Sequence, residues 1–225
     1  MSGTTLYIYG AGGHGRVILD LATTLGLCER MAFLDEEEAM CGRELDGVRV
    51  LGRLSELPPP GPEIAVAVAV GLDNARRLSL HERLSGEGYA LPALVHPRAW
   101  VAESASIGPG TVIMANAAVG VGATIGAACI VNTSASVDHD CVLEDGVHAA
   151  PGATLCGGVH VGRLSLVGSG ASVIQGISIG EACVIGAGAA VVEHLPANAT
   201  ALGVPAKVQR KVLKRGLKLR GGRRG

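Results

Sequence analysis

An aliphatic side chain recurs at every sixth position between Val95 and Val191, with no exception. An α-helix would place apolar residues about every 3.6 positions, and a simple strand would alternate apolar with polar residues. A period of six fits neither pattern. It predicts instead that this part of the chain folds as a solenoid of short strands.

Two other positions of the repeat support this interpretation. The position two residues before each aliphatic residue usually holds a small side chain, and both positions are expected to face inward. The position after the aliphatic residue is often glycine, as at Gly108 and Gly120, or Asn132. Because Gly and Asn tolerate positive φ, the chain is expected to turn a corner there. Three six-residue segments would close a triangular coil, which gives between five and six coils stacked about 4.8 Å apart.

The segment before the repeat has the pattern of a nucleotide-binding βαβ unit. A strand is predicted over residues 6–9, and the GAGGHG loop of residues 10–15 fits GxGxxG. A helix over residues 16–25 and a strand over residues 31–34 follow, and Asp35 ends that strand. In such a unit the glycines and the helix N-terminus face a phosphate, and the acid receives a ribose hydroxyl.

The length of this segment limits the nucleotide. One more strand is predicted over residues 64–70 and one more helix over residues 73–84, so only half of a dinucleotide fold precedes the repeat. We therefore expect a mononucleotide in preference to NAD. A glycine turn that only packs the helix on its strand is the alternative.

Composition excludes several classes of partner. A net charge of −1 argues against nucleic acid, although nine Lys and Arg residues crowd the last twenty positions. That tail is interpreted as solvated, with contact to coenzyme A or to membrane headgroups as the alternative.

No apolar run reaches the length of about 18 residues needed for a membrane span, and no basic stretch precedes an apolar one at the start, so a cytoplasmic protein is expected. The six cysteines include no CxxC pair and are expected to be reduced.

Polar residues of the repeat gather between residues 131 and 160. His139 lies two positions after the inward Val137 and so points outward, and Gly157 occupies the same register eighteen residues later. An imidazole beside a residue without a side chain has open space and a backbone N–H next to it. Asp138 and Asp140 would orient the ring and keep its pKa near neutrality, as a general base requires. A solvated histidine between two acids is the alternative, and no third ligand suggests a metal.

A second histidine, His148, lies nine residues or half a coil from His139. Within one chain the two would point from different faces, and they would meet only across an interface between subunits. Flat apolar faces on so short a prism make an oligomer plausible.

Taken together, these motifs resemble those of a known family. The chain is similar to the left-handed parallel β-helix (hexapeptide-repeat) acyltransferases, and among them to bacterial nucleotide-sugar N-acetyltransferases that acetylate a 4-amino sugar of the bacillosamine or perosamine type. Sialic acid O-acetyltransferases are similar in layout. The resemblance rests on YGAGGHG, FLDE, VGLDNARR, VHPRAWV, VNTSASVDHDC, GVHAAPGA and GVPAK, in that order.

The resemblance implies an architecture. A Rossmann-like α/β domain that binds a nucleotide sugar would span residues 1–93, and a left-handed β-helix would span residues 94–195. Residues 196–225 would form an extension with the basic tail. It also implies acetyl-CoA as co-substrate, a surface-glycan sugar as acceptor, no metal, and a homotrimer that binds coenzyme A between neighbouring prisms.

Site residues are also implied by the resemblance, position by position. His139 matches the general base and Asp140 its acidic partner, Asn132 matches an active-site asparagine, and the Gly157 N–H would bind the thioester oxygen. The positions that match coenzyme A contacts are His148, Gly157, Ser169 and Ala187. The positions that match nucleotide-sugar contacts are Gly12, Gly13, His14, Asp35, Glu36 and Gly71. Family members often have Asp where Glu36 stands, so the choice among UDP, GDP and dTDP remains open.

Three alternatives accompany this interpretation. An O-acetyltransferase acting on a sialic acid or another sugar hydroxyl would use the same His139. A non-catalytic trimer that binds nucleotide sugars belongs to a different class and would not need that imidazole. An acyl-cysteine route is the third, because Cys141 and Cys156 lie near His139, but it is disfavoured because the register of Cys141 faces inward.

Overall fold

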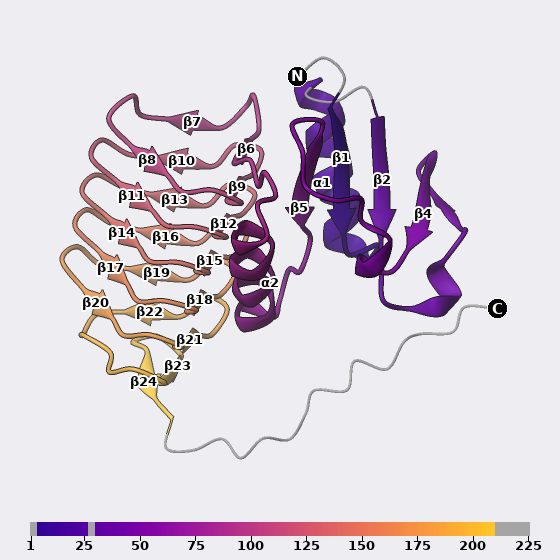
Figure 1. Cartoon of the computed structure of the whole chain (residues 1–225). Coiled ribbons are helices and arrows are strands. Elements are labelled where there is room, and N and C mark those ends of the chain that lie inside the picture. Colours follow the sequence, from indigo (N-terminus) through magenta and orange to yellow (C-terminus); the bar gives the residue numbers. More distant parts are fainter. Residues whose placement is uncertain (1–3, 27–29, 210–225) are drawn as a thin grey trace.

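The computed structural model describes residues 4–26 and 30–209, and it contains an N-terminal α/β unit beside a long coil of short strands (Figure 1). The N-terminal unit is built on β1 (Thr5–Tyr9), which pairs in parallel with β2 (Arg30–Leu34) and with β5 (Ile64–Val68). Two helices complete it, α1 (Gly13–Leu25) and α2 (Asn74–Gly86). These elements confirm the predicted order of strands and helices, although α1 begins three residues before the predicted start.

The ends of both helices follow from local sequence. Gly26 ends α1 in the left-handed conformation, with φ of 58°, which glycine adopts without a Cβ clash. Asp73 precedes α2, and its side chain accepts a hydrogen bond from the Arg76 N–H. Asp73 therefore satisfies one of the free donors in the first turn.

A hairpin at the sheet edge was not predicted. The strand β4 (Val48–Gly52) pairs in parallel with β2 and antiparallel with β3 (Glu44–Leu45), giving the order β3-β4-β2-β1-β5. Asp46 and Gly47 form its turn with φ of 47° and 81°, and an Asp-Gly pair is a strong hairpin signal. Two short 3-10 helices, η1 (Glu38–Met40) and η2 (Leu54–Glu56), flank this hairpin.

The coil consists of three parallel sheets that meet at corners, and we name them sheets C, D and E. Sheet C contains β6 (Leu94–Val95), β9 (Val112–Ile113), β12 (Ile130–Val131), β15 (His148–Ala149), β18 (Leu166–Val167) and β21 (Val184–Ile185). Sheet D contains β7 (Trp100–Val101), β10 (Ala118–Val119), β13 (Ser136–Val137), β16 (Thr154–Leu155), β19 (Ser172–Val173) and β22 (Ala190–Val191). Sheet E contains β8 (Ser106–Ile107), β11 (Thr124–Ile125), β14 (Val142–Leu143), β17 (His160–Val161) and β20 (Ser178–Ile179).

Strand pairing confirms the six-residue side and the eighteen-residue coil. Val95 pairs with Ile113, and Ile113 pairs with Val131, each step advancing eighteen residues. The aliphatic series is inward as predicted, since Ile113, Val131 and Val137 are no more than 1% exposed. The coil is therefore filled by side chains and is not a channel.

The role predicted for the glycines after the aliphatic residues is wrong. Positive φ occurs two positions later, at Gly110 and Gly122, not at Gly108 and Gly120. A Cβ on Gly120 would lie 2.6 Å from the His139 backbone nitrogen in the next coil. Glycine is required there because successive coils approach each other closely, not because the chain turns.

Cysteines in the inward register behave as predicted. Cys129, Cys141 and Cys183 are fully buried, and each Sγ donates to a backbone carbonyl oxygen of the next coil at 3.1 Å. The five cysteines in the described part of the chain are free thiols. Cys28 lies outside the described residues.

Strand pairing continues past the last predicted repeat. The strand β23 (Thr200–Leu202) extends sheet C in parallel with β21, and β24 (Lys207–Val208) pairs antiparallel with β23. The predicted basic tail falls almost wholly on residues 210–225, which lie outside the described residues. Within residues 4–26 and 30–209, no helix combines the length and the apolar character needed to cross a bilayer.

The N-terminal unit covers part of sheet C. Val112 and Ile130 face outward from the coil, yet both are buried in one cluster with Ile18 of α1 and Phe33 of β2. The next outward position along this ladder is His148, which pairs in register with Ile130. The contact between the two units therefore buries a polar residue of the repeat.

Candidate active site

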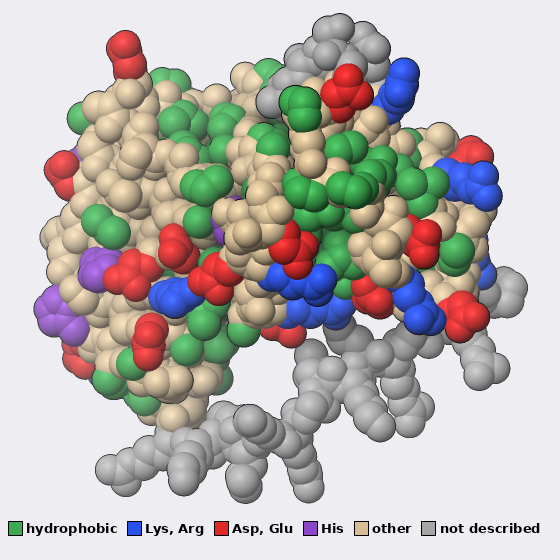
Figure 2. Space-filling view, in the orientation of Figure 1, with side chains coloured by type: hydrophobic (Ala, Val, Ile, Leu, Met, Phe, Trp, Pro, Cys, Tyr) green, Lys and Arg blue, Asp and Glu red, His purple; other side chains and the backbone are tan. Residues whose placement is uncertain are grey.

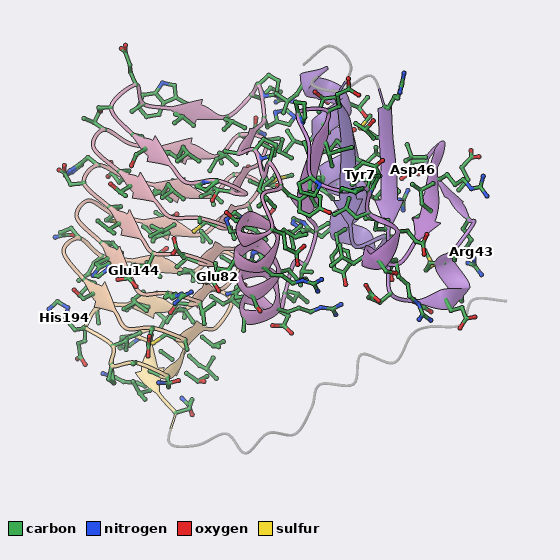
Figure 3. All side chains as sticks on the ribbon, in the orientation of Figure 1. Tyr7, Arg43, Asp46, Glu82, Glu144 and His194 are labelled. Carbon is green, nitrogen blue, oxygen red and sulfur yellow. The ribbon has the colours of Figure 1, made fainter. Side chains whose placement is uncertain are left out.

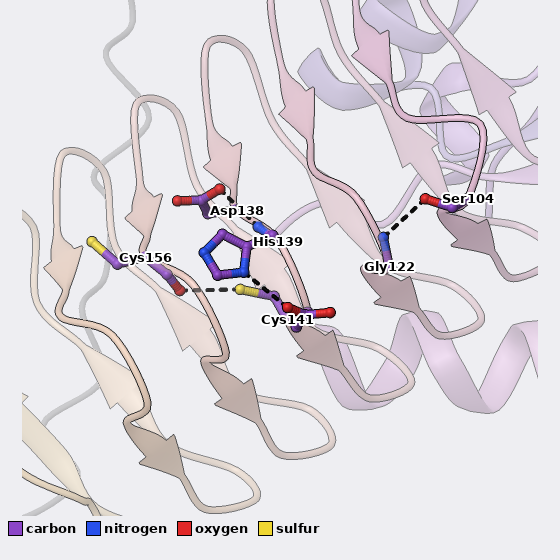
Figure 4. Close-up of polar contacts among 7 residues, drawn as sticks. Ser104, Gly122, Asp138, His139, Cys141 and Cys156 are labelled. Carbon is purple, nitrogen blue, oxygen red and sulfur yellow. Dashed lines mark hydrogen bonds and ion pairs between the residues drawn. The ribbon is translucent and has the colours of Figure 1, made fainter.

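His139 lies in the turn between β13 and β14, where sheets D and E meet (Figure 4). Its Nδ1 lies 2.9 Å from Asp140 Oδ2, and its backbone N–H donates to Asp138 Oδ1 at 2.7 Å. Since a carboxylate only accepts, Nδ1 carries the proton and Nε2 is left as the basic atom. The side chain is 61% exposed.

The two carboxylates raise the pKa of His139 above its ordinary value. The hydrogen bond that His139 donates to Asp140 is the largest cause, and the charge of Asp138 adds to it. Asp140 adopts φ of 57° at this corner, a conformation that Asp tolerates better than most residues. The positive φ at the corner thus places a carboxylate beside the imidazole.

Gly157 lies directly against the His139 ring, as the repeat predicted. A Cβ at this position would lie 2.3 Å from His139 Nε2. The Gly158 N–H donates to the His139 carbonyl at 2.9 Å, which fixes the spacing of the two coils here. The Gly157 N–H has no acceptor among the described residues, so it is free to donate to a bound group.

A shallow cavity of about 170 Å³ lies on sheet D and ends at this corner. It is lined by Trp100, Ser136, Asp138, Thr154 and Cys156, among others. Trp100 is 58% exposed and is the only tryptophan of the chain. Trp100 was not among the predicted site residues, although a single tryptophan in an outward register of the repeat is a visible sequence signal.

A second cavity, of about 220 Å³, lies at the carboxyl ends of β1, β2 and β5. Asp35 and Glu36, the predicted nucleotide-sugar contacts, line it together with Tyr9 and Arg76. The Tyr9 hydroxyl donates to Glu36 Oε1 at 3.2 Å and accepts from the Arg76 guanidinium at 3.2 Å. Burial raises the pKa of Tyr9, which keeps the hydroxyl protonated. Tyr9 and Arg76 were missed, although both lie within the quoted YGAGGHG and VGLDNARR motifs.

The glycine loop and Asp35 are bonded to each other. The Ala11 N–H donates to Asp35 Oδ2 at 2.7 Å, and the Glu37 N–H donates to Oδ1 at 2.9 Å. Gly12 caps α1 without a side-chain hydrogen bond, and the space beside Gly12 and Gly13 is open. The helix N-terminus therefore presents free N–H groups toward an anion.

His14 and His148 lie at the contact between the two units, close to Gly71. A Cβ on Gly71 would meet the His14 side chain at 3.3 Å. Asn132 Oδ1 accepts from the Thr133 N–H at 2.8 Å, so Asn132 Nδ2 donates to His148 Nε2 at 3.1 Å. Burial, followed by the Arg77 charge, lowers the pKa of His14 and of His148 to about 4. Both imidazoles are therefore neutral at physiological pH.

One chain thus brings the predicted residues together in separate groups. His139, Asp140 and Gly157 meet at the corner of sheets D and E. Asn132, Ser169 and Ala187 lie at the corner of sheets C and D, with Ser169 and Ala187 exposed. His148 is only 4% exposed, so its contact with coenzyme A stays a prediction.

A larger cavity of about 540 Å³ lies on sheet E, near Glu144 and His194 (Figure 3). Glu144 already accepts from the His160 ring at 2.8 Å and from the Arg163 N–H at 2.9 Å. The cavity contains none of the predicted site residues. Among the described residues, no group of three or more His, Cys, Asp or Glu side chains is placed to hold a metal ion.

Known proteins resemble both units. Residues 5–84 match the family model described as the PglD N-terminal domain. The acetyltransferase domain of PglB from Neisseria gonorrhoeae FA1090, solved with acetyl coenzyme A, is 40% identical. The alignment covers 91% of this chain and 98% of that one, with a TM-score of 0.86. The chain belongs to the hexapeptide-repeat acetyltransferases of the PglB type.

Other acetyltransferases are similar to this chain. PerB from Caulobacter crescentus, solved with CoA and GDP-perosamine, is 37% identical, with 92% of this chain and 97% of that chain covered and a TM-score of 0.84. UDP-N-acetylbacillosamine N-acetyltransferase from Bacillus subtilis (strain 168) is 41% identical over 108 residues. That match spans 48% of this chain and half the length of the curated relative. The family fold confirms the predicted Rossmann-like domain followed by a left-handed β-helix.

Proposed function

We propose that this acetyltransferase moves the acetyl group of acetyl-CoA to the amine of a nucleotide-linked 4-amino sugar used in surface glycans. The relatives support this proposal, since two are named as N-acetyltransferases or acetyltransferases of this kind and PerB was solved with GDP-perosamine. The observation that carries it is the largely exposed His139 imidazole, bonded to Asp140 through Nδ1 and with Nε2 lying against Gly157.

In this proposal transfer is direct. His139 Nε2 takes a proton from the amine as its nitrogen attacks the thioester carbonyl, and the Gly157 N–H donates to the oxygen that becomes negative. Such a donor contributes roughly 3 kcal/mol to transition-state stabilisation. The tetrahedral intermediate then collapses, the carbon–sulfur bond breaks, and the imidazolium returns its proton to the leaving thiolate of CoA. Asp140 stabilises the imidazolium in between.

The acceptor nucleotide is assigned to the cavity at the ends of β1, β2 and β5. The Gly12–Gly13 backbone and the N-terminus of α1 would bind the diphosphate, and Asp35 and Glu36 would bind the ribose and base, with His14 and Gly71 facing the sugar side. Arg76 adds a cation to this cavity. The base is proposed only as one of uracil, guanine or thymine.

A homotrimer is part of the proposal. His139 and Gly157 lie at one corner of the prism, whereas Asn132, Ser169 and Ala187 lie at another. Packing three prisms about a threefold axis would bring the first corner of one chain against the second corner of its neighbour, with acetyl-CoA between them. We assign residues 1–93 to the nucleotide-sugar domain, 94–195 to the acetyltransferase domain and 196–225 to the extension. A cytoplasmic location fits, because acetyl-CoA is supplied there.

A direct test is an acceptor screen with acetyl-CoA. UDP-, GDP- and dTDP-linked 4-amino sugars and free sialic acid are each incubated with the protein, and products are identified by mass and by resistance of the acetyl group to mild base. We expect an amide product from one nucleotide-linked amino sugar. A base-labile product from sialic acid would favour the O-acetyltransferase. Binding of a nucleotide sugar with no product would favour the non-catalytic trimer.

A further inference from the structure

Arg77, on the second turn of α2, is an arginine buried without a carboxylate partner in the described part of the chain. It is 1% exposed, and burial lowers the pKa of its guanidinium to about 10. It therefore remains charged at neutral pH. An isolated buried charge is costly unless every donor is satisfied. The acceptors of its hydrogen bonds therefore identify the parts of the chain that Arg77 joins.

All five N–H donors of Arg77 are used. Within the N-terminal unit, Nη1 donates to the carbonyls of Val70 at 2.9 Å and Gly71 at 3.2 Å. Nη2 donates to Asn74 Oδ1 on α2 at 2.9 Å. On the coil, Nε donates to the Ala128 carbonyl and Nη2 to the Gly146 carbonyl, both at 2.8 Å. One guanidinium thus binds both units.

The helix follows a row of coil corners. Gly110, Ala128, Gly146 and Leu164 occur eighteen residues apart, and each has positive φ. Arg77 bonds the second and third corners, and Asn74 Nδ2 donates to the Leu164 carbonyl at 3.0 Å. His81 packs at the first corner, where a Cβ on Gly110 would lie 2.4 Å from its Nδ1.

Two similar repeats explain this fit. An α-helix advances about 5.4 Å per turn, and successive coils lie about 4.8 Å apart. Each turn of α2 therefore meets about one coil, in reverse order along the chain. An ion pair between Glu82 and Arg163 adds a further contact between α2 and the coil.

Of the carbonyls that Arg77 binds, those of Val70 and Gly71 lie beside the cavity assigned to the nucleotide. Val70 lines that cavity, and Gly71 supports the His14 ring. The same guanidinium lies close enough to His14 and His148 for its charge to oppose their protonation. A shift of the Val70–Gly71 segment would move a bound nucleotide relative to the coil.

We propose that Arg77 is a positioning residue that locks the Val70–Gly71 segment to two coil corners and so fixes where the acceptor sugar is held relative to the β-helix. This inference rests on the proposed function for its catalytic consequence, but the lock itself does not depend on it. A misplacement of about 1 Å can cost about a hundredfold in rate, so a rigid lock has functional value.

The test compares Arg77→Met, Arg77→Lys and a matched control, Arg83→Met. Arg83 lies on the same helix and is 62% exposed, and among residues 4–26 and 30–209 its ion pair is with Glu87 at 2.8 Å. Hydrogen exchange of each folded, substrate-free protein is followed by mass spectrometry. We expect amides of residues 65–80 in Arg77→Met to exchange at least about tenfold faster, with amides of the coil core unchanged. Arg83→Met should match the unaltered protein.

Kinetics then separate positioning from stability. In Arg77→Met we expect kcat/KM for the nucleotide sugar to fall about 10- to 100-fold, with the KM for acetyl-CoA unchanged. Arg77→Lys, which keeps the charge but has three donors, should recover part of both losses, and it carries the test if Arg77→Met does not fold. Unchanged exchange in the Arg77 variants, or fast exchange with undiminished kcat/KM, would overturn the inference. Failure of the unaltered protein to acetylate any acceptor would reject the proposed function, while the exchange comparison would still decide the lock.

Discussion

The imidazole at the corner of sheets D and E and the two imidazoles at the contact between the units differ in every physical respect. His139 is exposed, and two carboxylates raise its pKa. His14 and His148 are largely buried beside an arginine, and their pKa values fall to about 4. Residue type alone therefore does not make a histidine a base. The groups around the imidazole decide whether it exchanges a proton near neutral pH or stays neutral.

The surroundings of the two groups also differ. Figure 2 shows few charged side chains over the upper coils, whereas acidic and basic side chains gather along a band that includes the region of α2. On the coil, Asp138 and Asp140 place two negative charges beside His139. At the contact between the units, the single charge of Arg77 is enclosed by carbonyl oxygens. The following predictions alter one side of this comparison at a time.

The largest effect is expected from Gly157→Ala. The new Cβ would lie 2.3 Å from His139 Nε2, so the exposed ring must rotate away from Gly157. Loss of base position together with disturbance of the oxyanion donor predicts a fall in kcat of about a thousandfold. The melting temperature should change little, because the flexible ring can move.

Gly61→Ala is the control for this substitution, since nothing lies near its Cβ position. Both variants are assayed by initial acetylation rate at saturating substrates. Equal rates in the two variants would show that the contact of Gly157 with the imidazole has no catalytic role.

The two buried imidazoles, His14 and His148, predict a dependence of stability on pH. Folding depresses the pKa of His14 and His148 from 6.5 to about 4, so the unfolded state binds protons first as the pH falls. The stability they contribute is full above pH 6.5 and is lost between pH 6.5 and about 4. The loss is about 3 kcal/mol for each imidazole.

Urea denaturation of the unaltered protein and of His148→Gln at pH 7 and pH 4.5 measures this effect. The variant should lose about 2 to 3 kcal/mol less on acidification. An identical pH dependence in both proteins would mean that His148 is not held neutral by the fold.

A smaller effect is expected from Asp140→Asn. Asn tolerates the left-handed backbone at this corner but lacks the carboxylate whose hydrogen bond and charge both raise the pKa of His139. The pH midpoint of kcat/KM should move down, and kcat should fall about 10- to 100-fold.

Asp138→Asn provides the comparison, because it removes only the charge of Asp138, which raises the pKa of His139 less than the hydrogen bond to Asp140 does. It should shift the midpoint in the same direction by a smaller amount. A larger shift in Asp138→Asn than in Asp140→Asn would contradict the assignment of Asp140 as the hydrogen-bonded partner.

Much of the coil was predictable because its period is strict. Val95 to Val191 fixed the register, and the register alone placed Gly157 beside His139. The Asp46–Gly47 hairpin was also readable and was missed. The glycine register was misread because positive φ and close approach both select glycine, and only the distance between coils distinguishes the two causes.

The contact between the units was not predictable from the repeat. His148 occupies an outward register, and the periodicity does not indicate that α1 and α2 cover that face. Arg77 is one of two adjacent arginines on a helix, and its sequence pattern is that of a solvated residue. Its burial follows from the match between helix pitch and coil spacing, which depends on how α2 docks.

The central claim is that the exposed, carboxylate-flanked imidazole is the base of acetyl transfer. The most direct measurement is the acetylation rate of His139→Ala at saturating acetyl-CoA and acceptor, with melting temperature recorded alongside. We expect a rate at least about 100-fold lower with an unchanged melting temperature, because the side chain is 61% exposed. A folded His139→Ala protein that acetylates within about threefold of the unaltered rate would contradict it.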